Sequence, residues 1–287
     1  MDGLLNFFCS NFTLYLKALY TKLVIFFVFA SLVFALPSFA QREGDILYNK
    51  ELVVGINFHT NGGLIGGGMI RYTKKLARGE FKGASAPGVG GTTLISIPDD
   101  KLFWQVGLDL SFIKNPKELR YLNPTTNNTY IAYKKNAMFV IRPQIGLEWV
   151  LFRKAEEDGV QIDFMLTGGP SLGFLKPYYI EYQYGTTSKF EAFDPNIHND
   201  FNRILGAASA LTGLDECKVV PGFHLKPALS FEMGKFNGNV TGIEIGALVE
   251  GFTEKMIILQ TPDNSPSIQN KQLFSSVFLT VYYGFRR

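Results

Sequence analysis

The chain has 287 residues, of which 46% are hydrophobic, 14% aromatic and 18% charged, and its 28 basic and 25 acidic side chains leave a net charge of only +3. The many aromatic residues exclude a disordered chain, and the balanced charge excludes a basic field for nucleic acid. The two cysteines, Cys9 and Cys217, are too few for a disulfide framework or a four-ligand zinc site.

Residues 1–40 have the pattern of a secretory signal peptide. Lysines precede an apolar core at 23–36, and Pro37 and the small-residue pattern Ser38-Phe39-Ala40 follow it. We therefore expect cleavage after Ala40, which leaves 41–287 as a single mature domain. An uncleaved N-terminal membrane anchor is the alternative.

Beyond residue 40, apolar residues alternate with polar or small ones, and no run reaches the roughly 18–20 apolar residues of a membrane-spanning helix. In 136–151 every odd position is apolar, up to Trp149 and Leu151, whereas even positions include Arg142 and Glu148. In a β-strand these two sets face opposite sides of the sheet. The same alternation predicts eight strands, at 51–60, 63–74, 101–113, 132–151, 160–182, 219–236, 239–252 and 273–285.

The two faces of these strands differ in the way that a lipid environment requires. One face is almost purely large and apolar, and the other mixes glycine, glutamine and charges of both signs. A closed barrel is the β-structure that satisfies every backbone group inside a bilayer. We predict an all-β fold, a transmembrane antiparallel up-and-down β-barrel in the bacterial outer membrane, with lipid around it and both termini in the periplasm. A secreted β-sandwich is the alternative.

The connections between the strands support this orientation. Long polar segments at 114–131, 183–218 and 253–272 fall on the external side, and short turns at 153–159 and 236–239 fall on the periplasmic side.

Three segments fit this pattern less simply. The stretch 75–100 is long for a periplasmic turn, and a hairpin containing Thr92–Ile97 would raise the strand count to ten. The alternation loses phase near Gly168-Gly169-Pro170, which predicts a β-bulge or a sharp bend. Within the external loop 183–218, the residues Ile204–Leu214 suggest a short helix.

Three segments carry a resemblance to a known group of proteins. The hairpin at 53–63, the stretch Gly168–Gly173 and the terminal Tyr282-Tyr283-Gly284-Phe285 resemble small Bacteroidota outer-membrane barrels, the PorT-like or generic outer-membrane β-barrel families. The alternating terminal strand resembles the signal read by the barrel-assembly machinery, although Arg286-Arg287 replace a final aromatic residue. The resemblance implies fold and location, suggests an accessory role in secretion, and carries no catalytic residue.

No constellation in the sequence predicts catalysis, a metal or a cofactor. Barrel hydrolases place a serine two residues from a histidine on one strand, and neither His59, His198 nor His224 has this arrangement. Asp194 and Asp200, which share a loop with His198, are interpreted as solvated loop residues rather than a cation site. We therefore predict that the protein is not an enzyme.

The inward face of the predicted barrel collects many ionisable residues, and an eight-stranded barrel is only wide enough to be filled by side chains. Because an isolated buried charge is costly, these residues should pair. The predicted structural lumen network contains Glu51, His59, Arg71, Lys101, Asp109, Arg142, Glu148, Asp163, His224, Lys226, Glu232 and Glu244.

The function that follows is a non-enzymatic barrel with a closed, charge-paired lumen, which acts through its external loops or partner contacts. The loop 183–218 is the expected surface for an envelope protein partner. An accessory subunit of an envelope secretion or surface-transport machine is the alternative function, and a narrow channel is the third.

Overall fold

The computed structural model describes residues 48–76, 101–153, 159–233, 239–261 and 270–287, all within one compact unit, Glu43–Arg287. The predicted signal peptide lies outside the described residues, as do 77–100 and most of the two predicted short turns. Within the described ranges, no helix is long and apolar enough to cross a membrane.

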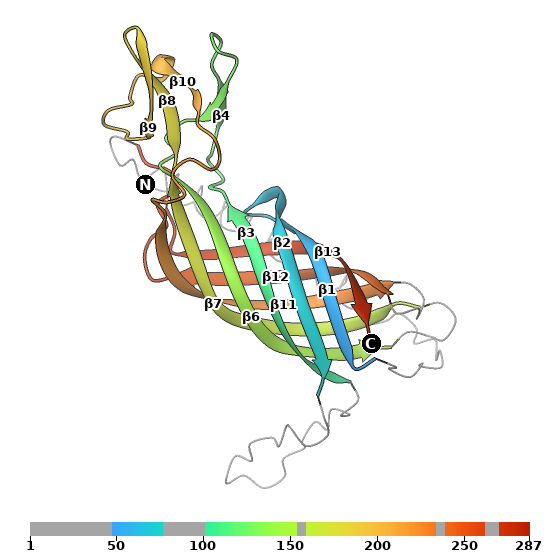
Figure 1. Cartoon of the computed structure of the whole chain (residues 1–287). Coiled ribbons are helices and arrows are strands. Elements are labelled where there is room, and N and C mark those ends of the chain that lie inside the picture. The colour runs from blue at the N-terminus through green and yellow to red at the C-terminus, as the bar shows by residue number, and fades with distance from the viewer. Residues whose placement is uncertain (1–47, 77–100, 154–158, 234–238, 262–269) are drawn as a thin grey trace, which may run out of the picture. The chain divides into compact units, whose positions relative to one another are not determined.

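Eight strands form a closed antiparallel barrel in which neighbours in sequence are neighbours in space (Figure 1). The strands are β1 (Lys50–His59), β2 (Gly63–Lys75), β3 (Leu102–Ile113), β6 (Asn136–Phe152), β7 (Gln161–Pro177), β11 (Lys218–Met233), β12 (Asn239–Phe252) and β13 (Leu273–Arg286).

The barrel is closed by pairing of its first and last strands, with Ile56 opposite Val281. Each strand of the ring has two hydrogen-bonded neighbours, and β2 pairs directly with β3 from Gly67 to Lys75. The prediction of eight strands is therefore confirmed. The ten-strand alternative and the β-sandwich are wrong, because a closed ring of eight leaves no free edge for a further hairpin and no second sheet to pack on.

The period-two alternation of the sequence corresponds to inward and outward side chains. In β13, every even position from Phe274 to Gly284 is buried, and the odd positions from Leu273 to Phe285 are exposed. The exposed side chains are mostly large and apolar, whereas the buried set includes many charged residues. The polarity of the barrel is thus the reverse of that of a water-soluble protein.

The predicted bulge at Gly168-Gly169-Pro170 is wrong, because β7 keeps one register with β11 along its whole length. The pairing of β6 with β7 does have a gap here, at which Pro143 comes opposite Pro170, but the register is the same on both sides of it and shifts only farther along, between Val150 and Phe152. Proline has no N–H to donate, so two facing prolines interrupt the ladder without shifting it. Gly169 allows the close approach there, since an added Cβ would lie 2.3 Å from the Pro143 carbonyl oxygen.

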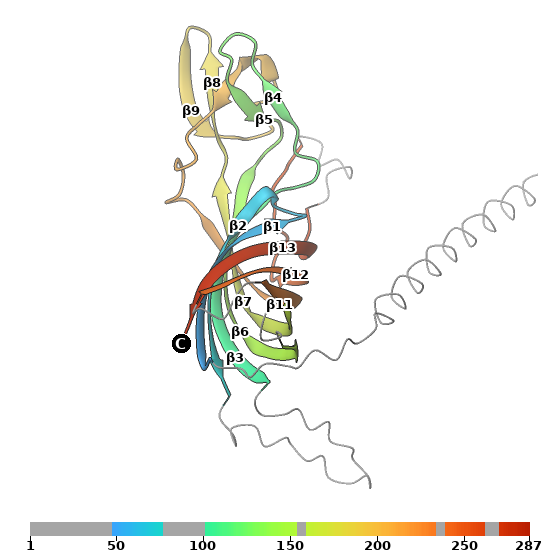
Figure 2. The same cartoon turned by 90° about the vertical axis from the view of Figure 1, so that its right-hand side faces the viewer.

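The end of the barrel opposite Lys50 and Arg286, here called the distal end, carries two further small sheets (Figure 2). One is the hairpin of β4 (Arg120–Leu122) and β5 (Thr129–Ile131), and the other has the order β10-β8-β9. Its strands are β8 (Tyr179–Tyr184), β9 (Thr187–Ala192) and β10 (Ile204–Ala207), and a short 3-10 helix, η1 (Phe201–Arg203), precedes β10. We call residues 114–135 and 178–217 together the distal extension.

The distal extension has its own apolar core, made of Tyr130, Ile180, Tyr182, Phe193 and Ile204. Its two sheets are joined by the Asn123 side-chain amide, which donates to the Ile204 carbonyl oxygen at 2.7 Å. The helix predicted for Ile204–Leu214 is wrong, because Ile204–Ala207 pairs with β8 and Gly213 has a left-handed φ of +78° that ends any helix there.

Candidate functional site: the packed lumen and a distal cavity

The residues predicted to face the lumen lie inside the barrel. Each of the following is less than a tenth exposed: Glu51, His59, Arg71, Asp109, Arg142, Glu148, Asp163, His224, Lys226, Glu232 and Glu244. Lys101 differs, since it precedes the first residue of β3 and is only half-buried. Glu250, Asn57, Gln105 and Gln144 are also buried on inward positions, and the period-two rule applied to every strand would have found them.

Arg142 is the central cation of the distal half of the lumen. Its Nε and Nη2 donate to the two carboxylate oxygens of Glu250 at 2.7 and 2.9 Å, and its Nη1 donates to Asp109 at 3.0 Å. Asp109 also accepts from Ser111 at 2.6 Å and from Asn57 at 2.7 Å. Charge-assisted, partly bidentate bonds of this kind compensate for the removal of the ions from water.

Lys226 and Arg71 extend the network toward the middle of the barrel. Lys226 Nζ lies 3.2 Å from Glu244 and 3.8 Å from Asp109, and Arg71 Nη1 donates to Glu244 at 2.8 Å. The carboxylates and cations of this network come from β2, β3, β6, β11 and β12. The pairs Arg142–Glu250, Arg71–Glu244 and Lys226–Asp109 connect strands that are not neighbours in the sheet, whereas Arg142–Asp109 and Lys226–Glu244 join neighbouring strands.

Arg286 completes the network at the end of the lumen opposite the distal end, here called the terminal end. Its guanidinium pairs with Glu51 and Glu232 and lies 3.8 Å from the centre of the Tyr48 ring. The sequence identifies this residue only as a departure from an aromatic chain end. The structure places Phe285 on the outward face and turns Arg286 inward.

The structure forms two serine–histidine pairs that the sequence criterion could not detect. Ser111 Oγ lies 3.0 Å from His59 Nε2, and Ser171 Oγ lies 3.0 Å from His224 Nδ1. In both pairs the serine belongs to another strand, so no fixed spacing along the chain reveals it. The cavity beside His59 and Ser111 has a volume of about 10 Å³, the space of a single water molecule, so it cannot admit a substrate.

The distal mouth of the lumen is filled by apolar side chains. Met256, Ile258 and Leu259 are buried against inward residues of β3, β6, β7, β11, β12 and β13. Backbone hydrogen bonds hold this segment in place, from Lys135 N to the Ile258 oxygen at 2.9 Å and from Gln260 N to the Tyr133 oxygen at 2.8 Å. The segment 256–260 thus lies across the mouth of the barrel.

Aromatic side chains gather at two levels on the outward face. Toward the terminal end, Tyr72 contacts Trp104 and Trp149 stacks on Phe164, with ring centroids 6.1 and 5.6 Å apart. Toward the distal end, Phe139 stacks on Phe174 at 4.8 Å and lies 6.5 Å from Phe112. Between the two levels, the outward positions of β3, β6 and β7 are Val106, Leu108, Leu110, Ile141, Pro143, Ile145, Leu147, Leu166, Gly168, Pro170 and Leu172.

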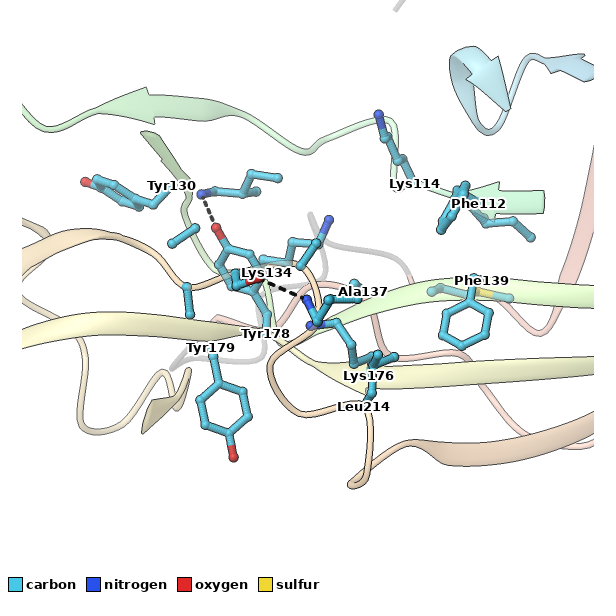
Figure 3. A pocket seen from close by; sticks show the side chains of 18 of the residues that line it. Phe112, Lys114, Tyr130, Lys134, Ala137, Phe139, Lys176, Tyr178, Tyr179 and Leu214 are labelled. Carbon is cyan, nitrogen blue, oxygen red and sulfur yellow. Dashed lines mark hydrogen bonds between the residues drawn. The ribbon is translucent and has the colours of Figure 1, made fainter. Parts of the chain in front are cut away.

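A cavity of about 590 Å³, here called the distal cavity, lies where the outer wall of the barrel meets the distal extension. Its walls come from the distal ends of β3, β6 and β7, from the β4–β5 hairpin and from the loop 207–214. Figure 3 shows Phe112 and Phe139 toward one end of the cavity and Tyr130 and Tyr178 toward the other. Its volume is within the range of small-molecule sites.

The polar groups of the distal cavity are mainly cationic. Lys114, Arg120, Lys134 and Lys176 line it, and no aspartate or glutamate is among its described lining residues. The Tyr178 hydroxyl accepts a hydrogen bond from the Ile131 N–H at 3.0 Å, and burial raises the pKa of this hydroxyl, so it stays protonated at neutral pH. The sequence could not reveal this site, because its walls come from segments far apart along the chain.

Comparisons with known proteins show only a distant likeness of fold. No protein-family model and no curated protein matches the sequence. The chain is similar to the crystal structure of Neisserial surface protein A, with a TM-score of 0.36 and 7% identity over 85% of this chain and 100% of that one. It is also similar to Ail, the attachment invasion locus protein of Yersinia pestis, with a TM-score of 0.35 and 10% identity over 84% of this chain and 100% of Ail. Likenesses this distant carry no argument about function.

Proposed function

We propose that the protein is a non-enzymatic integral outer-membrane β-barrel with a closed lumen, which acts through its distal extension. The observation that carries this proposal is the outward surface, an apolar band bounded at both ends by aromatic rings. A water-soluble barrel has no need of such a band, whereas lipid requires it.

The height of this band matches a bilayer. Trp149 and Phe139 are ten residues apart on β6, as are Phe164 and Phe174 on β7. Ten residues span about 33 Å along a strand, and a strand tilt of about 40° reduces this to about 25 Å along the barrel axis. Transmembrane barrels have an apolar band of about 25 Å between their aromatic girdles.

A membrane location also assigns each end of the barrel to one side of the membrane. The even number of strands puts the start of β1 and the end of β13 on the same side of the barrel and the distal extension on the other. We assign the side with the strand ends to the periplasm, as is typical of outer-membrane barrels. The outward Phe285 on the last strand supports recognition of that strand by the barrel-assembly machinery. The same features underlie the resemblance to small Bacteroidota barrels of PorT-like type.

The lumen is proposed to be a structural core rather than a pore. Arg142, Lys226 and Arg71 pair with lumen carboxylates, and the segment 256–260 lies across its distal mouth. We expect no stable conductance from the protein in planar bilayers. Steps of open-pore size would contradict the closed lumen and favour the narrow channel.

A substitution on the apolar band tests the membrane location. Ile145 lies midway between the aromatic levels on β6 and is 64% exposed. Ile145→Arg should reduce the stability of the barrel in phospholipid vesicles by about 2–4 kcal/mol, the cost of a cation at the bilayer midplane. The matched control is Ile197→Arg on the distal extension, where Ile197 is 57% exposed and the cost should stay below about 0.5 kcal/mol.

Fraction folded is measured from heat-modifiable migration on a semi-denaturing gel. If Ile145→Arg is as harmless as Ile197→Arg, or if the protein stays folded in water without detergent or lipid, the proposed membrane location is wrong.

A second candidate function is an accessory subunit of an envelope secretion or surface-transport machine. Exposed apolar side chains on the distal extension favour a protein partner there, notably Leu119, Leu122 and Phe190. Cross-linking from a photoreactive residue at position 190 should then trap one defined partner. Absence of any cross-link in intact cells would count against this function.

A further inference from the structure

The distal cavity has the chemistry of a site for an anionic amphiphile. Its floor is formed by outward residues of the barrel, Leu110, Phe112 and Phe139, which also form the upper edge of the apolar band. Its other walls belong to the distal extension, which in the proposed orientation is outside the membrane. The cavity is therefore continuous with the lipid-facing surface and extends above it.

Among the residues that the structure describes, only one of the cavity's cations has an acidic partner. Lys134 pairs with Glu118 at 2.8 Å. Lys114 and Arg120 are exposed and have no acidic partner among the described residues. Their charges are available to a ligand.

Lys176 is the most informative of these cations. It lies on an outward position of β7, yet it is only 8% exposed because the loop 207–214 covers it. Its Nζ donates to the Thr212 carbonyl oxygen at 2.7 Å and has no carboxylate partner in the described part of the chain. A buried ammonium without a counter-ion is costly, and an anion in the cavity would remove that cost.

Two of these features together select the kind of ligand. The apolar floor suits acyl chains that enter from the surrounding lipid, and the cations above it suit phosphate groups at the level of the head groups. A soluble anion would use the cations but not the floor, and a neutral lipid would use the floor but not the cations.

We propose that the distal cavity binds a phosphorylated, multiply acylated lipid of the outer leaflet, with its acyl chains against Phe112 and Phe139 and a phosphate near Lys176, Lys114 and Arg120. This proposal rests on the membrane location proposed above and names the ligand class of the distal extension. It assigns the bound lipid to the distal cavity rather than to the whole lipid-facing surface of the barrel.

The test is a lipid titration of the full mature protein in dodecyl maltoside micelles, followed by native mass spectrometry. The probe is diphosphoryl lipid A, compared with phosphatidylcholine and with inorganic phosphate. We expect one tightly held lipid A, bound at least about tenfold more tightly than phosphatidylcholine, and no retained inorganic phosphate. A tenfold preference corresponds to about one charge-assisted hydrogen bond.

Three variants separate the parts of the site. Lys176→Met keeps the apolar stem but removes the charge, and it should weaken lipid A binding about tenfold. The double variant Lys114→Gln, Arg120→Gln changes only exposed side chains and should weaken binding about threefold. Ala137→Phe narrows the cavity without a change of charge and should also weaken binding.

The matched control is the double variant Lys189→Gln, Arg203→Gln, which removes two exposed cations of the distal extension that do not line the cavity. Binding that falls equally in the control and in the cavity variants would overturn the proposal, as would equal affinity for phosphatidylcholine or retention of inorganic phosphate alone. Folding of each variant is scored by heat-modifiable migration. A failure of lipid A binding in a properly inserted barrel therefore overturns this inference and leaves the proposed function standing.

Discussion

Replacement of Arg142 by methionine tests whether the ion pairs of the lumen stabilise the barrel or only occupy space inside it. Arg142 is 2% exposed, and it is the ion-pair partner of Glu250, which is 1% exposed and has no other hydrogen-bond partner among the described residues. Asp109 would keep its bonds from Ser111 and Asn57 after the substitution. The variant therefore leaves one uncompensated carboxylate inside the barrel.

The expected cost follows from this geometry. Removal of one partner from a buried pair destabilises a protein by about 3–5 kcal/mol, because the remaining charge is left without compensation. The double variant Arg142→Met, Glu250→Gln removes both charges and should recover most of that loss. The control is Arg203→Met, whose pair with Asp200 has side chains 57% and 42% exposed and should cost at most about 1 kcal/mol.

The assay is equilibrium urea unfolding in phospholipid vesicles, followed by the fluorescence of Trp104 and Trp149, the two tryptophans of the chain. A loss for Arg142→Met no larger than that for Arg203→Met would refute the reasoning. So would a double variant that is less stable than Arg142→Met, since the lumen charges would then not be coupled.

Two further predictions concern the backbone and the distal extension. Gly169→Ala should cost about 1–3 kcal/mol in the same assay because its Cβ would meet the Pro143 carbonyl oxygen, whereas at Gly68 the nearest atom is 3.5 Å away and the alanine should be tolerated; equal losses would show that the facing prolines impose no close approach. The Tyr184 hydroxyl, which donates to Glu191, holds the pKa of that carboxyl below its ordinary value of 4.5, and His198 acts in the same direction. Glu191 therefore contributes stability that is present above pH 4.5 and is lost as the pH falls through the lower folded value. The protection factors of the β8 and β9 amides, which are corrected for the intrinsic pH dependence of exchange, should be lower at pH 3 than at neutral pH in the natural protein, and this loss of protection should be smaller in Glu191→Gln; an identical loss in both would contradict the assignment.

The sequence by itself predicted the number of barrel strands and the face on which each side chain lies. Both depend on a local property, since successive residues of a strand point to opposite sides whatever the strand pairs with. Residues such as Arg142, Glu244 and Ile145 could therefore be placed inside or outside the barrel from their odd or even position in the strand alone. Glu250 is an even-numbered position of the same strand as Glu244, so the same rule also places it inside the barrel.

The tertiary structure alone decided which of these residues meet. Arg142 and Glu250 are 108 residues apart, and Ser111 and His59 are brought together from different strands by the register of the closed ring. The uninterrupted register of β7 past Gly168, the strand at Ile204 in place of a helix and the inward turn of Arg286 were equally outside the local pattern.

The distal cavity shows the same division between local and tertiary information. The sequence identifies its phenylalanines as outward residues of strands. That the loop 207–214 covers Lys176, however, depends on how this loop packs against the outer face of the barrel. Alternation along a strand determines a direction for each side chain. The partner found in that direction depends on closure of the barrel and on the packing of its loops, which link segments far apart in the sequence.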